Sequence, residues 1–161
     1  MLPVLLKEDK DFSDILKYEE ECTVYVFDKN KFVFPLHATV KYGSSFNFGF
    51  YKEKIISEMD KKIYLLFSLL TNYNNYLPMG VYTYIPQASR LIDYSIDDGL
   101  LTLNVSDNFL RYNKGCKDEI LKTLVFSYTA IPGINKVKIV CENNNVFNEV
   151  FARDDFILSV C

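Results

Sequence analysis

The chain has 161 residues, of which 49% are hydrophobic and 24% charged, and this is the composition of a globular protein with one sizeable core. The formal net charge is −3 and no basic block with interleaved aromatics is present, so we expect no nucleic-acid partner. No apolar run approaches the ~18 residues that a membrane-spanning helix requires.

The N-terminal residues 1–21 are dominated by charge, with the run KEDKDFSDILKYEEE over residues 7–21. Phe12, Ile15 and Leu16 give a weak helical spacing, so we expect a short leader helix or a tether here. A single α+β domain is expected over residues 22–161. The first residues lack the basic region and the cleavage site of a signal peptide, which indicates either a cytosolic protein or a chain from which an export signal was removed.

A β-hairpin is predicted at the start of this domain. The run CTVYVF over residues 22–27 alternates β-branched and aromatic residues, and KFVFPLHATVK follows over residues 31–41. Residues 28–30 form a turn signal between them. Pro35 interrupts the second run, and because proline has no backbone N–H it indicates an edge strand or a bulge.

A glycine- and aromatic-rich loop, YGSSFNFGF over residues 42–50, precedes the longest predicted helix. The helix is expected to begin near Tyr51 and to end by Thr71, where NYNNYLPMG breaks the pattern. Apolar residues recur through it at steps of three and four and give it one apolar face.

A second hairpin is predicted after a short apolar run over residues 81–85. Its strands are residues 91–96 and 100–105, joined by Asp97-Asp98-Gly99, and an Asp-Gly pair between such runs is a strong hairpin signal. Ser106 follows, and its small hydroxyl side chain is expected to cap a short helical turn.

The second full helix is expected to begin at Cys116 or Lys117 and to end at Ala130 or Ile131, before Pro132-Gly133. A strand over residues 136–141 follows it. The last part of residues 147–161 is expected to form a final strand. The resulting order, roughly β-β-α-β-β-α-β, predicts an α+β domain in which two main helices pack on one face of a mixed β-sheet.

The sequence contains no recognisable catalytic motif. His37 is the single histidine, and a nucleophile elbow, a phosphate loop and a zinc-protease motif are all missing. Cys22 is a possible neighbour of His37 across the first hairpin, but nothing there predicts an activated thiolate. The hairpin turn explains Asp97-Asp98, and Asp154-Asp155 would need further ligands to bind a cation. We therefore assign no catalytic residue, no metal site and no cofactor.

The chain contains four cysteines at long and irregular spacings. A structural zinc site would require clustered ligands, so these residues do not predict one. An even number permits disulfides, but the spacings favour free thiols. The four are Cys22, Cys116, Cys141 and Cys161.

Four segments of the chain form an ordered pattern: TVYVFD from Thr23, the helix end SLLTNYNNYLP, the segment IPQASRLIDYSIDDGLLTLNVSDNFL, and LKTLVFSYTAIPGINKVKIVCENN from Leu121. In this order they resemble the GerM-like (GerMN) sporulation and spore-germination domain. The match covers residues 23–143. It departs from the family pattern at Ala130, where leucine is usual, and at Asn143-Asn144, which stand in place of a glycine.

The resemblance implies a non-enzymatic structural or protein-interaction module of the bacterial cell envelope, linked to sporulation or spore germination and similar to ring-building modules. It implies a protein partner in an envelope or sporulation complex, or self-association, and an extracytoplasmic, membrane-associated location. The chain carries no lipobox and no anchor, so membrane association would depend on an anchor outside it. The alternative location is the cytoplasm.

Two surfaces are candidates for binding. The exposed edge of the first hairpin can add a strand from another chain, with alternate contacts from Val24, Tyr25, Phe32, Phe34 and Tyr42. The alternative function is a glycan- or peptide-binding module that uses the aromatic loop over residues 42–51. A hydrolase with a dispersed site around His37 or Asp93 is the third hypothesis. The candidate interaction residues are Tyr25, Phe32, Tyr42, Phe46, Phe48 and Tyr51.

Overall fold

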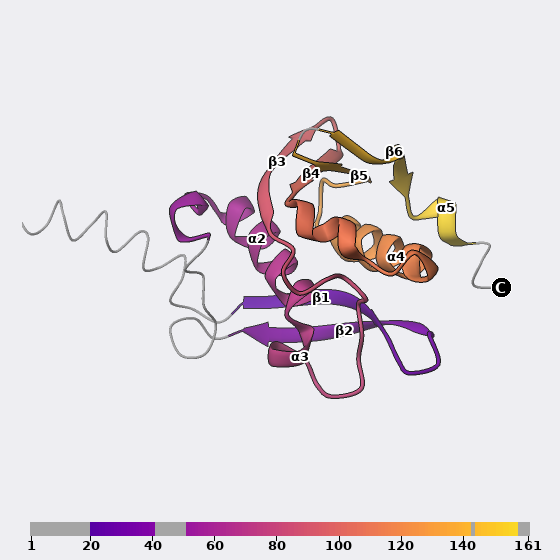
Figure 1. The fold of residues 1–161 in the computed structure, drawn as a ribbon. Helices are drawn as coiled ribbons and strands as arrows, with labels where there is room; N and C mark the ends of the chain where they lie inside the picture. Colours follow the sequence, from indigo (N-terminus) through magenta and orange to yellow (C-terminus); the bar gives the residue numbers. More distant parts are fainter. Residues whose placement is uncertain (1–19, 41–50, 143, 158–161) are drawn as a thin grey trace, which may run out of the picture.

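A computed structural model describes residues 20–40, 51–142 and 144–157 (Figure 1). The residues predicted as an N-terminal tether therefore lie almost wholly outside the described part, as does the loop over residues 42–50. The described elements are β1 (Glu20–Phe27), β2 (Val33–Val40), the 3-10 turn η1 (Lys52–Lys54), α2 (Glu58–Thr71), α3 (Tyr73–Tyr76), β3 (Leu91–Asp97), β4 (Leu100–Val105), the 3-10 turns η2 (Asp107–Arg111) and η3 (Lys114–Cys116), α4 (Lys117–Thr129), β5 (Lys136–Cys141), β6 (Asn144–Ala152) and α5 (Asp154–Ile157).

The fold is α+β, as predicted, with mixed strand pairing and two main helices. The described strands divide into two sheets, a separate β1–β2 hairpin and a four-stranded sheet in the order β3-β4-β5-β6. β4 and β5 are parallel, and the other neighbouring pairs are antiparallel. α2 and α4 lie on the same side of the four-stranded sheet, between it and the hairpin (Figure 1). α4 contacts β1 on one side and β5 and β6 on the other.

The long helix α2 begins later than the predicted start near Tyr51. Residues 52–54 form a 3-10 turn instead, and the helix begins after Ser57. The Ser57 hydroxyl accepts the backbone N–H of Asp60 (3.0 Å), and the Asp60 carboxylate accepts the backbone N–H of Ser57 (3.1 Å). This reciprocal capping box satisfies two donors that a helix start leaves unpaired, so the start is fixed at Ser57.

The predicted β3–β4 hairpin is confirmed, together with its turn. Asp98 has φ 50° and Gly99 has φ 82°, so both central residues are left-handed, as a tight two-residue hairpin turn requires. The carbonyl of Gly99 also accepts the backbone N–H groups of Asn135 (2.8 Å) and Lys136 (3.2 Å). The turn therefore fixes the start of β5, and with it the parallel β4–β5 register.

The boundaries of α4 agree with the prediction, and Tyr128 links this helix to α2. The Tyr128 side chain is fully buried, and its hydroxyl donates to the backbone carbonyl of Ile63 (2.9 Å). In the turn after the helix, Gly133 has φ 94°, a left-handed conformation that glycine adopts without steric cost.

The structure corrects two local predictions. Ser106 precedes η2 as expected, but its hydroxyl makes no cap there and instead accepts the backbone N–H of Arg90 (3.0 Å). The final strand is β6, not the last part of residues 147–161. It ends where the Asp155 carboxylate accepts the backbone N–H of Ala152 (2.7 Å), and the turn α5 follows. Residues 158–161 lie outside the described part.

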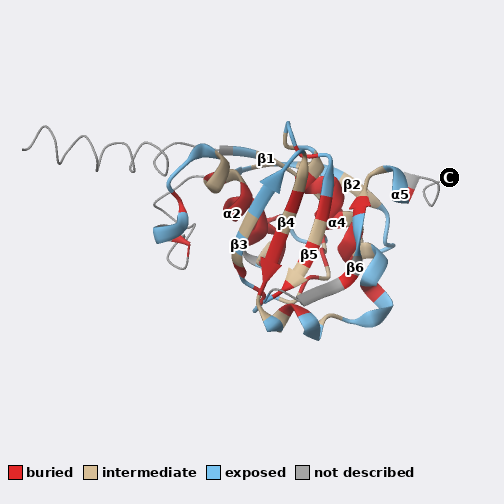
Figure 2. Ribbon diagram, turned by 90° about the horizontal axis from the view of Figure 1, so that it is seen from above, coloured by how far each residue is buried: buried red, intermediate tan, exposed pale blue. Residues whose placement is uncertain are grey.

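The core fills the space between the four-stranded sheet and the helices. β4 and β5 point alternate side chains into it, among them Leu101, Leu103, Val137 and Ile139. β3 is an edge strand and is mostly exposed, as Figure 2 shows. The hairpin contributes Val24 and Val26 from β1, so the helices are covered on both sides.

Candidate interaction surface

The candidate residue Tyr25 lies on β1, where its side chain is half-buried against α4. Its ring packs edge-on against Phe126, with ring centres 5.5 Å apart, and the guanidinium of Arg153 lies 5.0 Å from the centre of its ring. The same guanidinium donates to the carbonyl of Phe126 (2.8 Å). Tyr25 therefore holds the hairpin on the helix rather than facing a partner.

Phe32, unlike Tyr25, is exposed: 69% of its surface is accessible at the tip of the hairpin. The turn beneath it is fixed by Asp28, whose carboxylate accepts the backbone N–H groups of Asn30 (2.8 Å) and Phe32 (3.0 Å). Lys31 completes the turn in the left-handed region, at φ 64°. The turn therefore presents an exposed aromatic ring from an ordered backbone.

Tyr51, the third described candidate, is buried, with 6% of its side chain exposed. Its ring stacks on Tyr64 at 5.0 Å, and its hydroxyl accepts the backbone N–H of Leu91 (3.1 Å). Burial raises the pKa of this hydroxyl. Tyr51 packs in the core, and so the structure gives no support to its ring as a ligand platform. Tyr42, Phe46 and Phe48 lie outside the described residues.

The outward edge of β1 is closed by α4, a contact that the sequence did not predict. The hydroxyl of Ser127 accepts the backbone N–H of Tyr25 (2.8 Å), and the hydroxyl of Thr123 donates to the carbonyl of Tyr25 (3.0 Å). Further along the same edge, Phe27 exchanges two backbone hydrogen bonds with Tyr82 (2.8 Å each). Side chains and loop thus replace a neighbouring strand on this edge.

Among the described residues, none covers the edge of β2. Backbone groups along an antiparallel strand alternate between facing the paired strand and facing away from it. Because those of Tyr25 face away from β2, those of its partner Pro35 face away from β1, and so do those of His37 and Thr39. These three residues are exposed, and no described residue hydrogen-bonds to their outward backbone groups. Pro35 has no backbone N–H, and it lies at a position whose N–H would face away from β1, so no hydrogen bond between the strands is lost. This is the position expected of proline in an edge strand.

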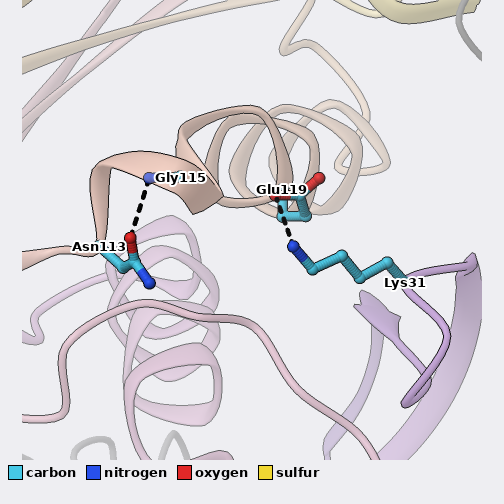
Figure 3. A network of polar contacts seen from close by, with 4 residues as sticks. All are labelled: Lys31, Asn113, Gly115 and Glu119. Carbon is cyan, nitrogen blue, oxygen red and sulfur yellow. Dashed lines mark hydrogen bonds and ion pairs between the residues drawn. The ribbon is translucent and has the colours of Figure 1, made fainter.

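An ion pair joins the hairpin turn to the start of α4. Lys31 lies 4.0 Å from the carboxylate of Glu119, and the side chain of Asn113 accepts the backbone N–H of Gly115 (2.9 Å) in the turn before the helix (Figure 3). The lysine is half-exposed, so this pair contributes at most about 1 kcal/mol. It orients the hairpin tip more than it stabilises the fold.

The structure describes the one histidine and three of the four cysteines. His37 is exposed, and its ring nitrogen lies 3.1 Å from the hydroxyl of Thr23. Burial raises the pKa of Cys141, which disfavours a reactive thiolate. No disulfide joins Cys22, Cys116 and Cys141 to one another, and Cys161 lies outside the described residues. Within the described ranges, no group of three or more histidine, cysteine, aspartate or glutamate residues is placed to hold a metal ion.

None of the helices in the described ranges combines the length and the apolar character needed to cross a bilayer.

A comparison with curated proteins found no match.

Solved structures share this fold. The chain is similar to the tandem GerMN domains of the sporulation protein GerM from Bacillus subtilis, with a TM-score of 0.68 and 16% identity, over 86% of this chain and 48% of that one. It thus spans about half of the tandem structure. The first GerMN domain alone aligns with a TM-score of 0.64 and 16% identity, over 84% of this chain and 99% of that one. A candidate lipoprotein from Clostridium perfringens aligns with a TM-score of 0.50 and 17% identity, over 85% of this chain and 89% of that one.

The family comparison matches most of the chain. The model of the Germane family, described as sporulation and spore germination, matches residues 23–147, close to the limits that the four sequence segments indicated. The chain therefore belongs to the Germane family of sporulation and spore-germination domains.

Proposed function

We propose that this chain is a non-enzymatic protein-interaction module of the bacterial cell envelope that acts in sporulation or spore germination. Membership of the Germane family supports the process. Similarity to a candidate lipoprotein supports an extracytoplasmic, membrane-associated location.

The open edge of β2 is the observation that carries this proposal. One edge of the hairpin is closed by Ser127, Thr123 and Tyr82, so the opposite edge is left to accept a strand. His37 and Thr39 offer N–H donors and carbonyl acceptors to that strand, whereas Pro35 offers a carbonyl alone. We propose that the partner is an extended segment of a protein in the same complex, with a second copy of this chain as the first to test.

The test is a backbone substitution on this edge. His37→Pro removes one outward N–H, and His37→Ala removes the imidazole but keeps that N–H. Sedimentation velocity over a range of protein concentrations measures self-association. We expect His37→Ala to associate like the wild type and His37→Pro to associate about 2- to 10-fold more weakly, because one hydrogen bond is lost. Circular dichroism of both variants checks that the fold is intact.

Equal association of the two variants would contradict the edge as the contact. A wild type that remains monomeric would exclude a second copy as the partner. The same two variants are then compared by heat-resistant spore counts in a sporulating strain that lacks the native gene. There His37→Ala is expected to restore spore yield and His37→Pro to restore it less.

A further inference from the structure

A polar cavity is lined, among the described residues, by none that belongs to β2. Its volume is about 470 Å³, within the range of small-molecule sites, and it is lined by the end of α2, by α3, by the loop before β3 and by η2. The polar side chains that line it include Ser68, Asn72, Gln87, Ser89, Arg90 and Asn108.

Ser89 has a buried hydroxyl group with no partner. The residue lines the cavity with 3% of its surface exposed, and its hydroxyl makes no hydrogen bond with any described residue. The backbone around it is fixed, because its N–H donates to the carbonyl of Pro86 (3.0 Å). A buried polar group without a partner costs free energy, and so it requires an explanation.

Other lining side chains also retain hydrogen-bonding capacity. Within the described residues, no hydrogen bond is formed by the hydroxyl of Ser68 or by the amides of Gln87 and Asn108. The framework between them is rigid, since the Asn72 amide donates to the carbonyl of Ser68 (3.1 Å) and to the hydroxyl of Thr71 (3.2 Å). Hydroxyl and amide groups both donate and accept, so they suit a ligand whose groups do the same.

The charge of the residues that line the cavity restricts the class of ligand further. Arg90 is the one charged residue among the described lining residues, which include no carboxylate. Its backbone is held by Ser106, whose N–H donates to the Arg90 carbonyl (2.8 Å) and whose hydroxyl accepts the Arg90 N–H (3.0 Å). With no carboxylate among the described lining residues, the cavity offers no ion-pair partner to a cationic ligand.

We propose that this cavity binds a saccharide of one or two residues through its hydroxyl groups. Sugar hydroxyls match the donor and acceptor character of Ser68, Ser89 and Asn108. Of the loop over residues 42–51, the structure describes Tyr51, which lines this cavity. It is independent of the β2 edge, so either proposal can fail without the other.

The experiment follows backbone amide shifts by NMR during titration with three probes: the N-acetylglucosamine disaccharide, glucuronate and the dipeptide Ala-Ala. We expect the two saccharides to shift the amides of Ser89, Arg90 and Asn108. Ser89→Ala is expected to weaken saccharide binding about tenfold, because a buried hydrogen bond is lost. Asn108→Ala, at the rim, is expected to weaken it less.

The matched control is Ser95→Ala, which removes an exposed hydroxyl from β3 and should leave binding unchanged. Urea unfolding should show Ser89→Ala to be at least as stable as the wild type, because the lost hydroxyl had no partner. Binding that is absent, or equal in Ser89→Ala and the wild type, would overturn the proposal and leave water as the occupant. Shifts with the dipeptide alone would overturn the saccharide assignment.

Discussion

At the scale of single residues, two hydroxyl groups on α4 decide which edge of the hairpin is open. Ser127 and Thr123 lie four positions apart on a helix face that is otherwise apolar, and both are buried. They bond to Tyr25 across 102 and 98 residues of sequence. In the sequence, the signal for this contact is a pair of polar residues four positions apart within the apolar stripe of the predicted helix.

Ser127→Ala tests this account at the residue scale. The substitution leaves the N–H of Tyr25 without a partner in a part-buried setting, and we expect it to lower the free energy of unfolding by about 1–3 kcal/mol. Urea denaturation monitored by circular dichroism measures the change. Ser95→Ala on the exposed face of β3 is the control and should change stability by less than about 0.5 kcal/mol. Equal stability of the two variants would show that the Ser127 contact has no energetic role.

At the scale of elements, the β3–β4 turn connects two parts of the four-stranded sheet. Gly99 closes the hairpin, and its carbonyl also binds the first residues of β5. A Cβ atom at this position would lie 2.6 Å from the Asn135 side chain, whereas one at Gly133 would meet nothing within 4 Å. Both glycines have positive φ, but only Gly99 has a close neighbour. Comparing alanine substitutions at the two positions therefore separates the cost of backbone strain from the cost of the steric clash with Asn135.

Gly99→Ala is expected to destabilise the protein more than Gly133→Ala. Each variant incurs the left-handed penalty of about 1–2 kcal/mol, and Gly99→Ala must in addition displace Asn135. Thermal unfolding of both variants measures the difference. Combining Gly99→Ala with Asn135→Ala should remove that difference. An unchanged gap would show that Asn135 is not the obstacle.

At the scale of the whole molecule, local signals predicted the elements and long-range contacts decided their arrangement. The Asp98-Gly99 turn and the limits of α4 depend on neighbours in sequence, and both were predicted. The division into two sheets was not, because it depends on the parallel β4–β5 pairing and on α4 packing between the hairpin and that sheet. The contact between the Tyr51 hydroxyl and Leu91 was not predicted either, because the two residues are 40 positions apart in sequence.

The candidate site was predicted in part. Pro35 correctly indicated an edge strand, and the exposed Phe32 lies at the end of that hairpin. The sequence could not show which of the two edges is open, because the residues that close β1 belong to α4 and to the segment containing Tyr82.

Hydrogen exchange at individual amides tests the central claim, that β1 is closed and β2 is open, most directly. In the isolated chain, the amide of Tyr25 should be protected like those between the two strands, and the amides of His37 and Thr39 should exchange quickly. On self-association or addition of the partner, only the amides of His37 and Thr39 should gain protection. Protection of these two amides in the isolated chain, or their continued fast exchange in the complex, would contradict the account.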